Sequence, residues 1–423
     1  MKLLEQILSS ENLKGAYERV RKNKGASGVD GMTTEELGRH LKKNLRTIKG
    51  AIRNRTYTPK PVKRVEIPKE NGKTRKLGIP SVTDRFIQQA IHQVLGPIFE
   101  QQFSASSYGF RPGRSAQDAV LKSVETMNQG KDWIVDIDLE RFFDTVHHDR
   151  LMNLIARTVD DGDVISLIRK YLVSGVMIGK TYEDTHVGTP QGGNLSPLLS
   201  NIMLNELDKE LEKRGLHFVR YADDCIIFTG SKKSAERVMK SVTRFIEEKL
   251  GLKVNATKSK VGRPDGIKYL GYGFYKDKEG VYHLIPHEKS VQKFIRTLKR
   301  LTKRNWSVSL TYRLQKLKEV IVGWVNYFKY GRMKRRLISI DQKLRARIRV
   351  IIWKQWKVSS KQIGALKQLG IDEDNAKGIT WCRKGYQYIG HSHLVQKALN
   401  NSRLKQRGLV SARDHYLKVY SAI

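Results

Sequence analysis

The spacing of hydrophobic and polar positions changes along the chain. Residues 1–60 show short helical patterns joined by a turn, KGASGVDG, whose glycines permit positive φ angles. From 61 to 285, strand-like segments such as DWIVDID and HFVRYADDCIIFTG alternate with helical ones such as DRFIQQAIHQVLGPIF. This alternation predicts an α+β domain that follows an N-terminal extension.

From residue 286 onwards the pattern is helical and basic. One face of the first predicted helix carries Val291, Phe294, Ile295, Leu298 and Leu301, and the opposite face carries Lys293, Arg296 and Lys299. A further break near 360 indicates a small terminal unit. The sequence therefore predicts four parts: residues 1–60, 61–285, 286–360 and 361–423.

The charge of the chain indicates a polyanionic partner. The 423 residues include 80 Lys and Arg against 42 Asp and Glu, a formal net charge of +38. Residues 286–423 hold 32 basic and 7 acidic residues, so about +25 of this charge lies there. Nucleic acid is the expected partner, and the chain is too long to be a small binding module.

The composition argues against membrane insertion and secretion, and against sites built from cysteines. No apolar run approaches the roughly 20 residues needed to cross a bilayer, and the charged N-terminal pattern does not resemble a signal peptide. We therefore expect no membrane partner and an intracellular protein. Cys225 and Cys382 are too few and too far apart for a disulfide framework or a cysteine zinc site, so oxygen atoms must hold any metal.

The strongest chemical signal is RYADDCIIF, which predicts a hairpin with Asp223 and Asp224 at its tip. Neighbouring carboxylates beside apolar strands repel each other unless a cation neutralises them, and Mg²⁺ prefers oxygen ligands. An isolated aspartate pair most often lies in a turn or caps a helix. The metal interpretation therefore depends on the neighbouring motifs.

A second source of carboxylates is the predicted strand 133–138. Asp136 and Asp138 share one face about 6.5 to 7 Å apart, so one of them can reach a metal more easily than both, and we expect it to be Asp138. Together with Asp223 and Asp224 it could hold two Mg²⁺ ions for nucleotidyl transfer.

Two further segments are consistent with nucleotide binding. In VGTPQGGNLSP, Gly192 and Gly193 allow close backbone approach, and a base pair could rest there. In VEIPKENGKTRKLGIP, two strands around a turn place Lys69 and Arg75 where they can project toward a triphosphate. Alone, each would be an ordinary helix-capping loop or a solvated basic hairpin.

In order along the chain, these segments resemble the motif series of group II intron-encoded reverse transcriptases and maturases. The motifs that carry the resemblance are IPK and TRKLGIP within 67–80, DRFIQQA and SYGFRPGRSAQDAV within 84–120, DIDLERFFDTVHHD at 136–149, GTPQGGNLSPLLSN at 188–201, YADD at 221–224, and NATKSKV with KYLGYGF within 255–274. The resemblance covers nearly the whole chain.

The resemblance implies a right-hand polymerase fold. Residues 61–285 would form fingers and a palm with an antiparallel sheet, 286–360 the helical thumb or maturase X domain, and 361–423 a DNA-binding D region. It also implies a compact bacterial protein of the group IIC kind, located in the cytoplasm. No Cys/His cluster for an HNH endonuclease is present, so we do not expect target cleavage.

The resemblance also implies roles for individual residues. Asp138, Asp223 and Asp224 would be the catalytic metal ligands, with Mn²⁺ as a possible substitute for Mg²⁺. The implied nucleotide-binding residues are Lys69 and Arg75 at the triphosphate, Gln191 in the pocket, Phe143 as the steric gate that favours deoxynucleotides, and Lys258 for phosphate contact or proton transfer. The implied primer grip is Tyr269, Leu270 and Gly271.

The implied activity is RNA-directed DNA synthesis combined with intron splicing and retrohoming. Its partners would be an RNA template, the group II intron RNA, a DNA primer, target DNA and dNTPs. The C-terminal aromatic residues are either helix core, which the spacing favours for Trp324 and Phe328, or stacking surfaces for unpaired bases. The group comprises Trp324, Tyr327, Phe328, Tyr330, Trp353 and Trp356.

Three alternatives remain open from the sequence. The chain could be an RNA-binding splicing factor without polymerase activity, although the complete Asp triad argues against this. It could be a domesticated reverse transcriptase in phage defence or spacer acquisition, although the long maturase-like region favours the intron. An RNA-dependent RNA polymerase would share the palm carboxylates, and Phe143 argues against that.

Overall fold

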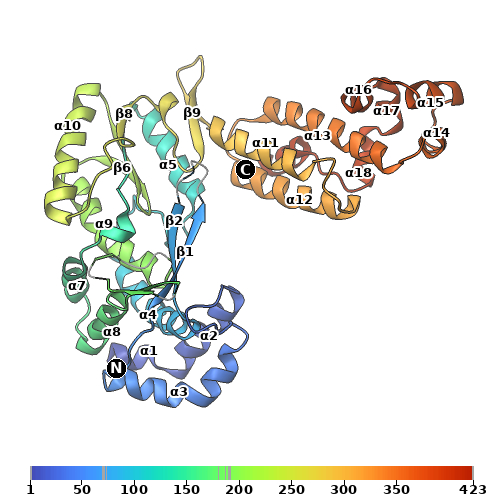
Figure 1. Cartoon of the computed structure of the whole chain (residues 1–423). Coiled ribbons are helices and arrows are strands. Elements are labelled where there is room, and N and C mark those ends of the chain that lie inside the picture. Colours follow the sequence, from blue (N-terminus) through green and yellow to red (C-terminus); the bar gives the residue numbers. More distant parts are fainter. Residues whose placement is uncertain are drawn as a thin grey trace. The chain divides into compact units, whose positions relative to one another are not determined.

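The computed structural model describes residues 2–68, 72, 74–179, 181–185, 187–188 and 192–421. The chain forms two compact units, Met1–Arg263 and Pro264–Ile423 (Figure 1). Strands β9 and β10 fall in the second unit. The predicted boundaries at 60, 285 and 360 stay predictions, because this two-way division does not test them.

Helices form the start of the first unit, as the sequence predicted. They are α1 (Leu3–Ile7), α2 (Ser10–Lys22), α3 (Leu37–Arg53) and α4 (Val82–Glu100). The Ser9 and Ser81 side chains cap α2 and α4 by accepting backbone N–H bonds. Asn12 on α2 donates through Nδ2 to the carbonyl of Ala90 at 3.0 Å, which fixes α2 along α4.

The first sheet has the order β2-β1-β4-β5. Its strands are β1 (Val62–Pro68), β2 (Thr74–Ile79), β4 (Val176–Ile178) and β5 (Thr181–Glu183). β1 and β2 pair antiparallel with Val65 opposite Leu77, so the two strands predicted around the Asn71-Gly72 turn are confirmed. This is the hairpin expected to carry the triphosphate-binding side chains.

The second sheet has the order β6-β7-β3-β8, and all its pairs are antiparallel. Its strands are β3 (Trp133–Ile137), β6 (His217–Tyr221), β7 (Asp224–Thr229) and β8 (Lys260–Gly262). This confirms the antiparallel palm sheet. Around it lie α5 (Ala116–Asn128), α6 (Phe142–Thr145), α7 (His148–Ala156), α8 (Gly162–Leu172), α9 (Ser196–Lys213) and α10 (Lys232–Arg244).

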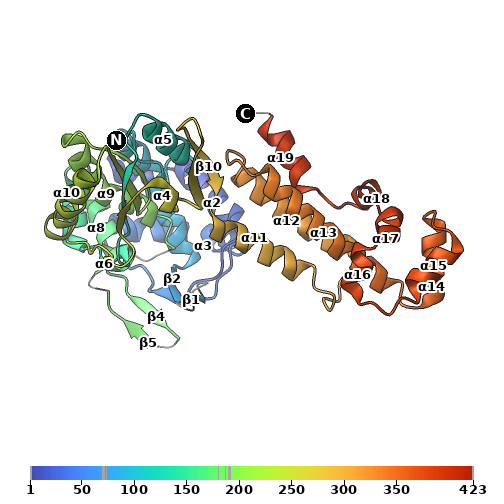
Figure 2. The same ribbon diagram turned by 90° about the horizontal axis from the view of Figure 1, so that it is seen from above.

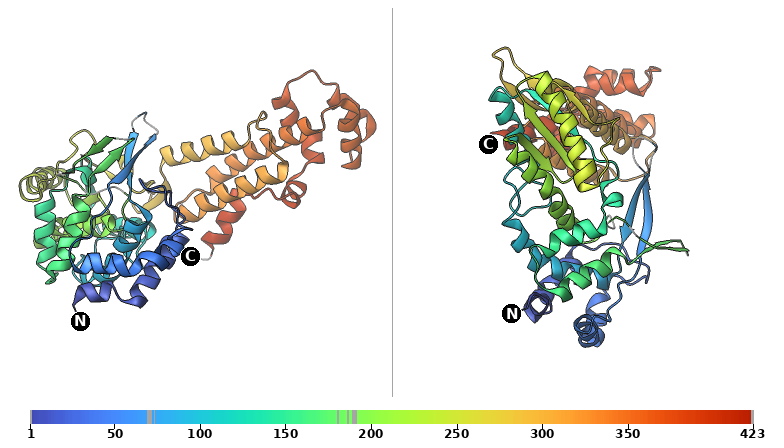
Figure 3. Two further views of the ribbon diagram at one scale, coloured as in Figure 1. Left: turned by 60° about the horizontal axis from the view of Figure 1, so that its bottom comes forward. Right: turned by 90° about the vertical axis from the view of Figure 1, so that its left-hand side faces the viewer.

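Strand alternation gives this sheet one apolar face and one face that carries acidic side chains. Val135, Ile137, Cys225 and Ile227 belong to the main hydrophobic core, together with residues of α9 and α10. Helix α10 contacts β3, β7 and β8, and the right panel of Figure 3 shows the yellow-green α10 lying over these strands. Asp136 and Asp224 alternate with these core residues and therefore belong to the opposite face.

The second unit is mainly helical, as predicted from 286 onwards. It begins with a two-stranded ribbon of β9 (Tyr272–Lys276) and β10 (Tyr282–Pro286). Three long helices follow: α11 (Glu288–Leu301), α12 (Leu310–Tyr327) and α13 (Lys334–Gln355). The short terminal helices are α14 (Ser359–Gln368), α15 (Glu373–Thr380), α16 (Tyr386–His391), α17 (His393–Ala398), α18 (Asn401–Gln406) and α19 (Ala412–Tyr420), labelled in part in Figures 1 and 2.

The long helices enclose an aromatic core. The rings of Phe294 and Trp324 stack with centroids 4.4 Å apart, and Trp324 and Phe328 lie 4.7 Å apart. Phe328 and Trp353 are buried. The interpretation of Trp324 and Phe328 as helix core is therefore confirmed. Across the described part of the chain, no helix is both long and apolar enough to span a bilayer.

Candidate active site

The register of the palm sheet brings the predicted carboxylates together. In the β3–β7 pair, Asp136 faces Ile226 and Ile137 faces Cys225. Extending this register by one residue sets Asp138 opposite Asp224. Facing residues of antiparallel strands have Cα atoms about 4.5 to 5.5 Å apart, so two segments far apart in sequence present their acids to one another.

The hairpin tip carries the third acid. Tyr221 pairs with Asp224, which leaves Ala222 and Asp223 as a two-residue turn. Ala222 has φ of +56°, a conformation that a residue with a Cβ atom adopts at a cost. The turn must therefore be held by its surroundings, and it keeps Asp223 next to Asp224 at the strand end.

A buried ion pair supports this turn from below. Arg220 donates to the Asp208 carboxylate of α9 through Nε at 2.7 Å, and both side chains are almost completely buried. Arg220 Nη1 also donates to the carbonyl oxygen of Ala222 at 2.9 Å and to Asn201 Oδ1 at 3.1 Å. The guanidinium thus ties the turn backbone to helix α9.

Gly109 completes the support. Its carbonyl oxygen accepts from Asn201 Nδ2 at 2.9 Å. A Cβ atom on Gly109 would lie 2.2 Å from the backbone nitrogen of Ala222, so only glycine fits beside the turn. No sequence pattern predicted the roles of Arg220, Asp208 and Asn201. The available signal was an arginine within the otherwise apolar strand that precedes the acids.

Asp138 is held by a separate loop. Its backbone oxygen accepts from the Asn255 N–H at 2.8 Å, and its backbone N–H donates to Ser259 Oγ at 3.0 Å. Lys258 Nζ lies 3.0 Å from both carboxylate oxygens of Asp138. The structure therefore places Lys258, a predicted site residue, directly on a predicted metal ligand.

The acids influence one another electrostatically. Although part of Asp224 is exposed, loss of solvation and then the negative charges of Asp223, Asp138 and Asp136 raise the pKa of Asp224 to about 6. Loss of solvation also raises the pKa of Asp136 to about 6, against the opposing effect of Lys260. These shifts are those expected of carboxylates gathered without a cation.

The donor chemistry fits a hard divalent cation, but the ligands are not preassembled. All the candidate donors are carboxylate oxygens, which Mg²⁺ and Mn²⁺ prefer. Among the residues that the structure describes, no group of three or more His, Cys, Asp or Glu side chains is arranged to hold a metal ion. Lys258 contacts both carboxylate oxygens of Asp138, so a metal ion at Asp138 would compete with Lys258 for that carboxylate.

Phe143 lies on α6, five residues after Asp138, and is partly buried against the core. Gly188 packs against its backbone: a Cβ atom on Gly188 would lie 2.9 Å from the carbonyl oxygen of Phe143. Gly188 also donates its N–H to Val146 at 2.8 Å, and His148 Nε2 contacts the Gly188 carbonyl at 2.6 Å. Gly188, which opens the segment GTPQGGNLSPLLSN, is thus fixed beside the predicted steric gate.

The end of the same motif contacts two other elements. A Cβ atom on Gly192, where φ is +125°, would lie 2.6 Å from the Gly78 carbonyl oxygen of β2. A Cβ atom on Gly193 would lie 2.8 Å from Gln88 Oε1 of α4. Glycine is therefore required beside β2 at Gly192 and beside α4 at Gly193, and the resting place for a base pair stays a prediction.

Of the three other residues predicted to bind the nucleotide, the structure describes only Arg75. Arg75 is exposed on β2, opposite Ile67 of β1. Lys69 and Gln191 lie outside the described residues. The contacts of these three side chains with a triphosphate or a nucleotide pocket stay predictions.

The predicted primer grip forms a tight turn in the second unit. Tyr269 and Tyr272 exchange backbone hydrogen bonds, and Leu270 and Gly271 between them have φ of +48° and +84°. Tyr327 Oη donates to the Leu270 carbonyl at 2.8 Å, and Ser290 Oγ donates to the Gly271 carbonyl at 2.8 Å. Tyr269 itself is buried, so its side chain belongs to the core.

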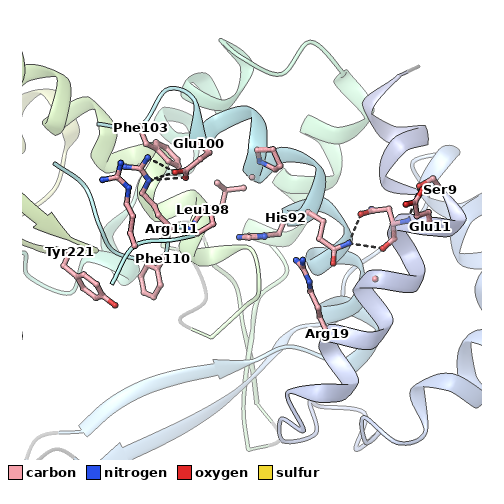
Figure 4. Close-up of a pocket in the computed structure, with 17 residues that line it drawn as sticks. Ser9, Glu11, Arg19, His92, Glu100, Phe103, Phe110, Arg111, Leu198 and Tyr221 are labelled. Carbon is pink, nitrogen blue, oxygen red and sulfur yellow. Dashed lines mark hydrogen bonds and ion pairs between the residues drawn. The ribbon is translucent and has the colours of Figure 1, made fainter. Parts of the chain in front are cut away.

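A cavity of about 970 Å³ lies beside the hairpin in the first unit. Figure 4 shows Tyr221, Phe110 and Arg111 at one end and His92 and Arg19 at the other. Arg111 is held there by Glu100 at 2.7 Å. This cavity runs from the catalytic strand to helices α2 and α4.

Removing the buried arginine should destabilise the first unit strongly. In the Arg220→Met variant, Asp208 stays buried without its cation, and we expect about 3 to 5 kcal/mol less free energy of unfolding. Urea unfolding measures this change. The exposed pair of Lys316 and Glu319 offers a matched control, where Lys316→Met should change stability by less than about 1 kcal/mol. Equal losses in the two variants would contradict the supporting role.

Divalent metal binding should depend on pH. Because the pKa of Asp224 is raised to about 6, a proton competes with the metal below that pH, and Mn²⁺ affinity should fall about tenfold between pH 7.5 and pH 5. Isothermal titration calorimetry in two buffers would detect the released proton. Asp224→Asn should bind weakly with a flatter pH dependence. An unchanged wild-type affinity across this range would reject Asp224 as a ligand.

Comparison with protein families agrees with this geometry. Residues 67–274 match the family "Reverse transcriptase (RNA-dependent DNA polymerase)", and residues 291–370 match "Group II intron, maturase-specific domain". The first match includes both palm strands that carry the acids. The second covers most of helix α11 and all of helices α12 to α14.

Individual relatives are similar over long stretches. Protein YkfC of Escherichia coli is 32% identical over 76% of this chain and 94% of YkfC. The group II intron-encoded protein LtrA of Lactococcus lactis is 31% identical over 63% of this chain and 55% of LtrA, so the chain spans about half of that relative. A solved partial Cas6-RT-Cas1–Cas2 complex aligns at 26% identity over 59% of this chain and 43% of that chain, with a TM-score of 0.38.

The palm sheet, the two family matches in sequence order and the long relatives lead to one assignment. The chain belongs to the group II intron-encoded reverse transcriptases and maturases, and it is an RNA-directed DNA polymerase with a maturase domain that serves intron splicing.

Proposed function

We propose that Asp138, Asp223 and Asp224 hold two Mg²⁺ ions at which a primer is extended by deoxynucleotides. The observation that carries this proposal is the register that sets Asp138 opposite Asp224, with Asp223 at the adjoining tip. When bound, such ions activate a 3′-hydroxyl and neutralise charge on the leaving pyrophosphate. Mn²⁺ can substitute, because it accepts the same oxygen ligands.

The other predicted residues bind and orient the nucleotide in this proposal. Lys69 and Arg75 contact the triphosphate, Gln191 shapes the pocket, and the ring of Phe143 excludes a ribose 2′-hydroxyl. The fixed contact of Gly188 with the Phe143 backbone supports this last role, since it sets the position of the ring.

In the absence of metal ions, the ammonium group of Lys258 supplies the positive charge beside Asp138. Its ammonium group lies on the Asp138 carboxylate and is largely exposed, so it can exchange Asp138 for a substrate phosphate or assist proton transfer. In the absence of substrate this contact limits the repulsion between Asp138 and the neighbouring acids. Residues 269–271 would hold the primer backbone.

The template strand would follow the cavity beside the hairpin. Tyr221, only two residues before Asp223, lines its catalytic end, and Arg19 and Arg114 supply positive charge. Exposed Phe110, which has φ of +59°, can contact a base. Backbone charge and flat side chains are the features that a sequence-independent template path requires.

The partners in this proposal are the intron RNA, which also serves as template, a DNA primer, target DNA and dNTPs. The basic second unit would bind the intron RNA for splicing and, in its terminal region, target DNA for retrohoming. The site of action would be the bacterial cytoplasm.

The first test is primer extension on an RNA template with Mg²⁺ and either dNTPs or rNTPs. Wild type should extend with dNTPs, and Asp223→Ala should lose at least about a hundredfold in rate, because it removes a metal ligand. Asp160→Ala, at an exposed acid outside the site, is the control and should extend normally. Failure of wild type to extend under any condition would favour an RNA-binding splicing factor without polymerase activity.

The steric gate has a separate test. Phe143→Ala should lower the preference for dNTPs over rNTPs by at least about tenfold, since the 2′-hydroxyl no longer meets a ring. The ratio of kcat/KM for the two nucleotides measures this preference. An unchanged ratio would show that another group selects the sugar.

The PQGG motif offers a test at the backbone. Gly192→Ala should reduce kcat/KM for dNTPs by more than about tenfold, because its Cβ would meet the Gly78 carbonyl and φ is positive. The matched control is Gly364→Ala on α14, where the added methyl group meets open space. Equal activity of the Gly192→Ala and Gly364→Ala variants would show that the close contact between Gly192 and β2 is not needed for activity.

A further inference from the structure

A basic cavity lies within the second unit, between the end of α11, helix α13 and the short helix α16. It has a volume of about 1250 Å³. Six cationic side chains line it: Lys299, Lys303, Arg304, Lys343, Arg347 and Lys354. No acidic side chain lines it among the residues that the structure describes. The cavity therefore concentrates positive charge without an internal counter-ion, and it suits an anionic ligand.

Helix geometry explains the charged wall. Lys343, Arg347 and Lys354 follow one another at intervals of four and seven residues, so they form a stripe along one face of α13. Arg347 donates through Nε to Thr302 Oγ1 at 2.6 Å and through Nη2 to the carbonyl oxygens of Lys299 and Thr302. Arg347 thus fixes the end of α11 and Lys354 Nζ donates to the carbonyl oxygen of Arg304 at 3.4 Å, while the exposed Lys343 can reach a ligand.

Helix α16, which forms another wall of the cavity, lies very close to α13. A Cβ atom on Gly390 would lie 2.6 Å from Val350 Cγ2 and 2.9 Å from the Ala346 carbonyl oxygen. Helix α16 therefore contacts α13 through a position that only glycine can occupy. This contact keeps Tyr386, the first residue of α16, at the rim of the cavity.

Tyr386 is an exposed aromatic ring in contact with a cation. Its ring lies 4.6 Å from the guanidinium carbon of Arg304, yet 40% of the residue remains exposed. The same short segment exposes Trp381 at 64% and Tyr388 at 48%, and Lys384 lies over the Tyr388 ring. Exposed rings interleaved with cations are unusual for a surface that meets only water.

We propose that this cavity and its aromatic rim bind an unpaired strand of nucleic acid. Lys299 on α11, Lys303 just after it, and the lysines of α13 would contact consecutive phosphates, and a base would stack on Tyr386. An unpaired strand is favoured over a duplex because stacking needs a free base face, which a duplex keeps inside its helix. This inference deepens the proposed function and rests on it, since the partners are nucleic acids there too.

The aromatic part is tested with the full chain and fluorescently labelled 15-nucleotide strands that form no internal pairs, as RNA, as DNA and as a duplex. Tyr386→Ala should weaken single-strand binding about tenfold by fluorescence anisotropy and leave duplex binding within twofold. Tyr386→Phe keeps the ring and should bind like wild type. Tyr420→Ala, at a similarly exposed tyrosine on α19, is the matched control.

The charged part is tested by the dependence of affinity on salt. Replacing Lys303 and Lys343 by glutamine should reduce the slope of log K against log salt by about 1.4 on a single strand, at about 0.7 per phosphate contact. Lys361→Gln, at an exposed lysine of α14 outside the cavity, should leave the slope unchanged.

The outcomes separate the possibilities. Weaker binding of single strands by Tyr386→Ala supports the proposal. If only RNA binding weakens, the site distinguishes ribose from deoxyribose; if RNA and DNA binding weaken alike, it does not. Equal loss on duplex and single strand, or wild-type binding by Tyr386→Ala and the lysine variant, overturns it. Primer extension by the wild-type chain is measured separately, so loss of the proposed polymerase function would not be mistaken for loss of this site.

Discussion

The buried ion pair between Arg220 and Asp208 is the constraint on which the β6–β7 hairpin depends. A guanidinium removed from water requires a full set of acceptors, and here these are the Asp208 carboxylate, the Asn201 side chain and the Ala222 carbonyl. Since Asp208 and Asn201 belong to α9, the helix that follows the PQGG motif is fixed to the turn that carries Asp223. Burial of one charge thus fixes the turn that carries Asp223 relative to the helix that follows Gly193.

This rigid support explains how like charges can be gathered on the open face of the sheet. The core face of β3 and β7 packs against apolar helices, while Asp136 and Asp224 on the other face carry raised pKa values. Repulsion among these acids would otherwise push the hairpin apart. Lys258 opposes it at Asp138, and the positive φ of Ala222 shows that the turn is held against its own preference.

The sequence predicted what depends on local pattern, and it missed what depends on distant contacts. Alternation predicted β3, which ends just before Asp138, and β7, which begins with Asp224. The position of Asp138 directly opposite Asp224 required the register, which spacing does not give. Arg220 was missed because its partner lies on a helix whose packing no short motif reveals. Spacing predicted that Trp324 belongs to the helix core, where it stacks on Phe294, but the contact of the exposed Tyr386 ring with Arg304 joins distant positions that spacing does not relate.

The two units differ in the charge of the side chains proposed to recognise phosphate: acidic in the first unit and basic in the second. In the first unit as proposed above, the carboxylates would need metal ions before they could face a triphosphate, so substrate binding would depend on metal and on pH. In the second unit, lysines and arginines such as Lys343 and Arg304 face the solvent directly, so binding depends on the release of counter-ions and weakens with salt. Because these dependences differ, salt and pH act on different units. Strand retention by the second unit should therefore weaken at salt concentrations that leave metal binding at Asp138, Asp223 and Asp224 intact.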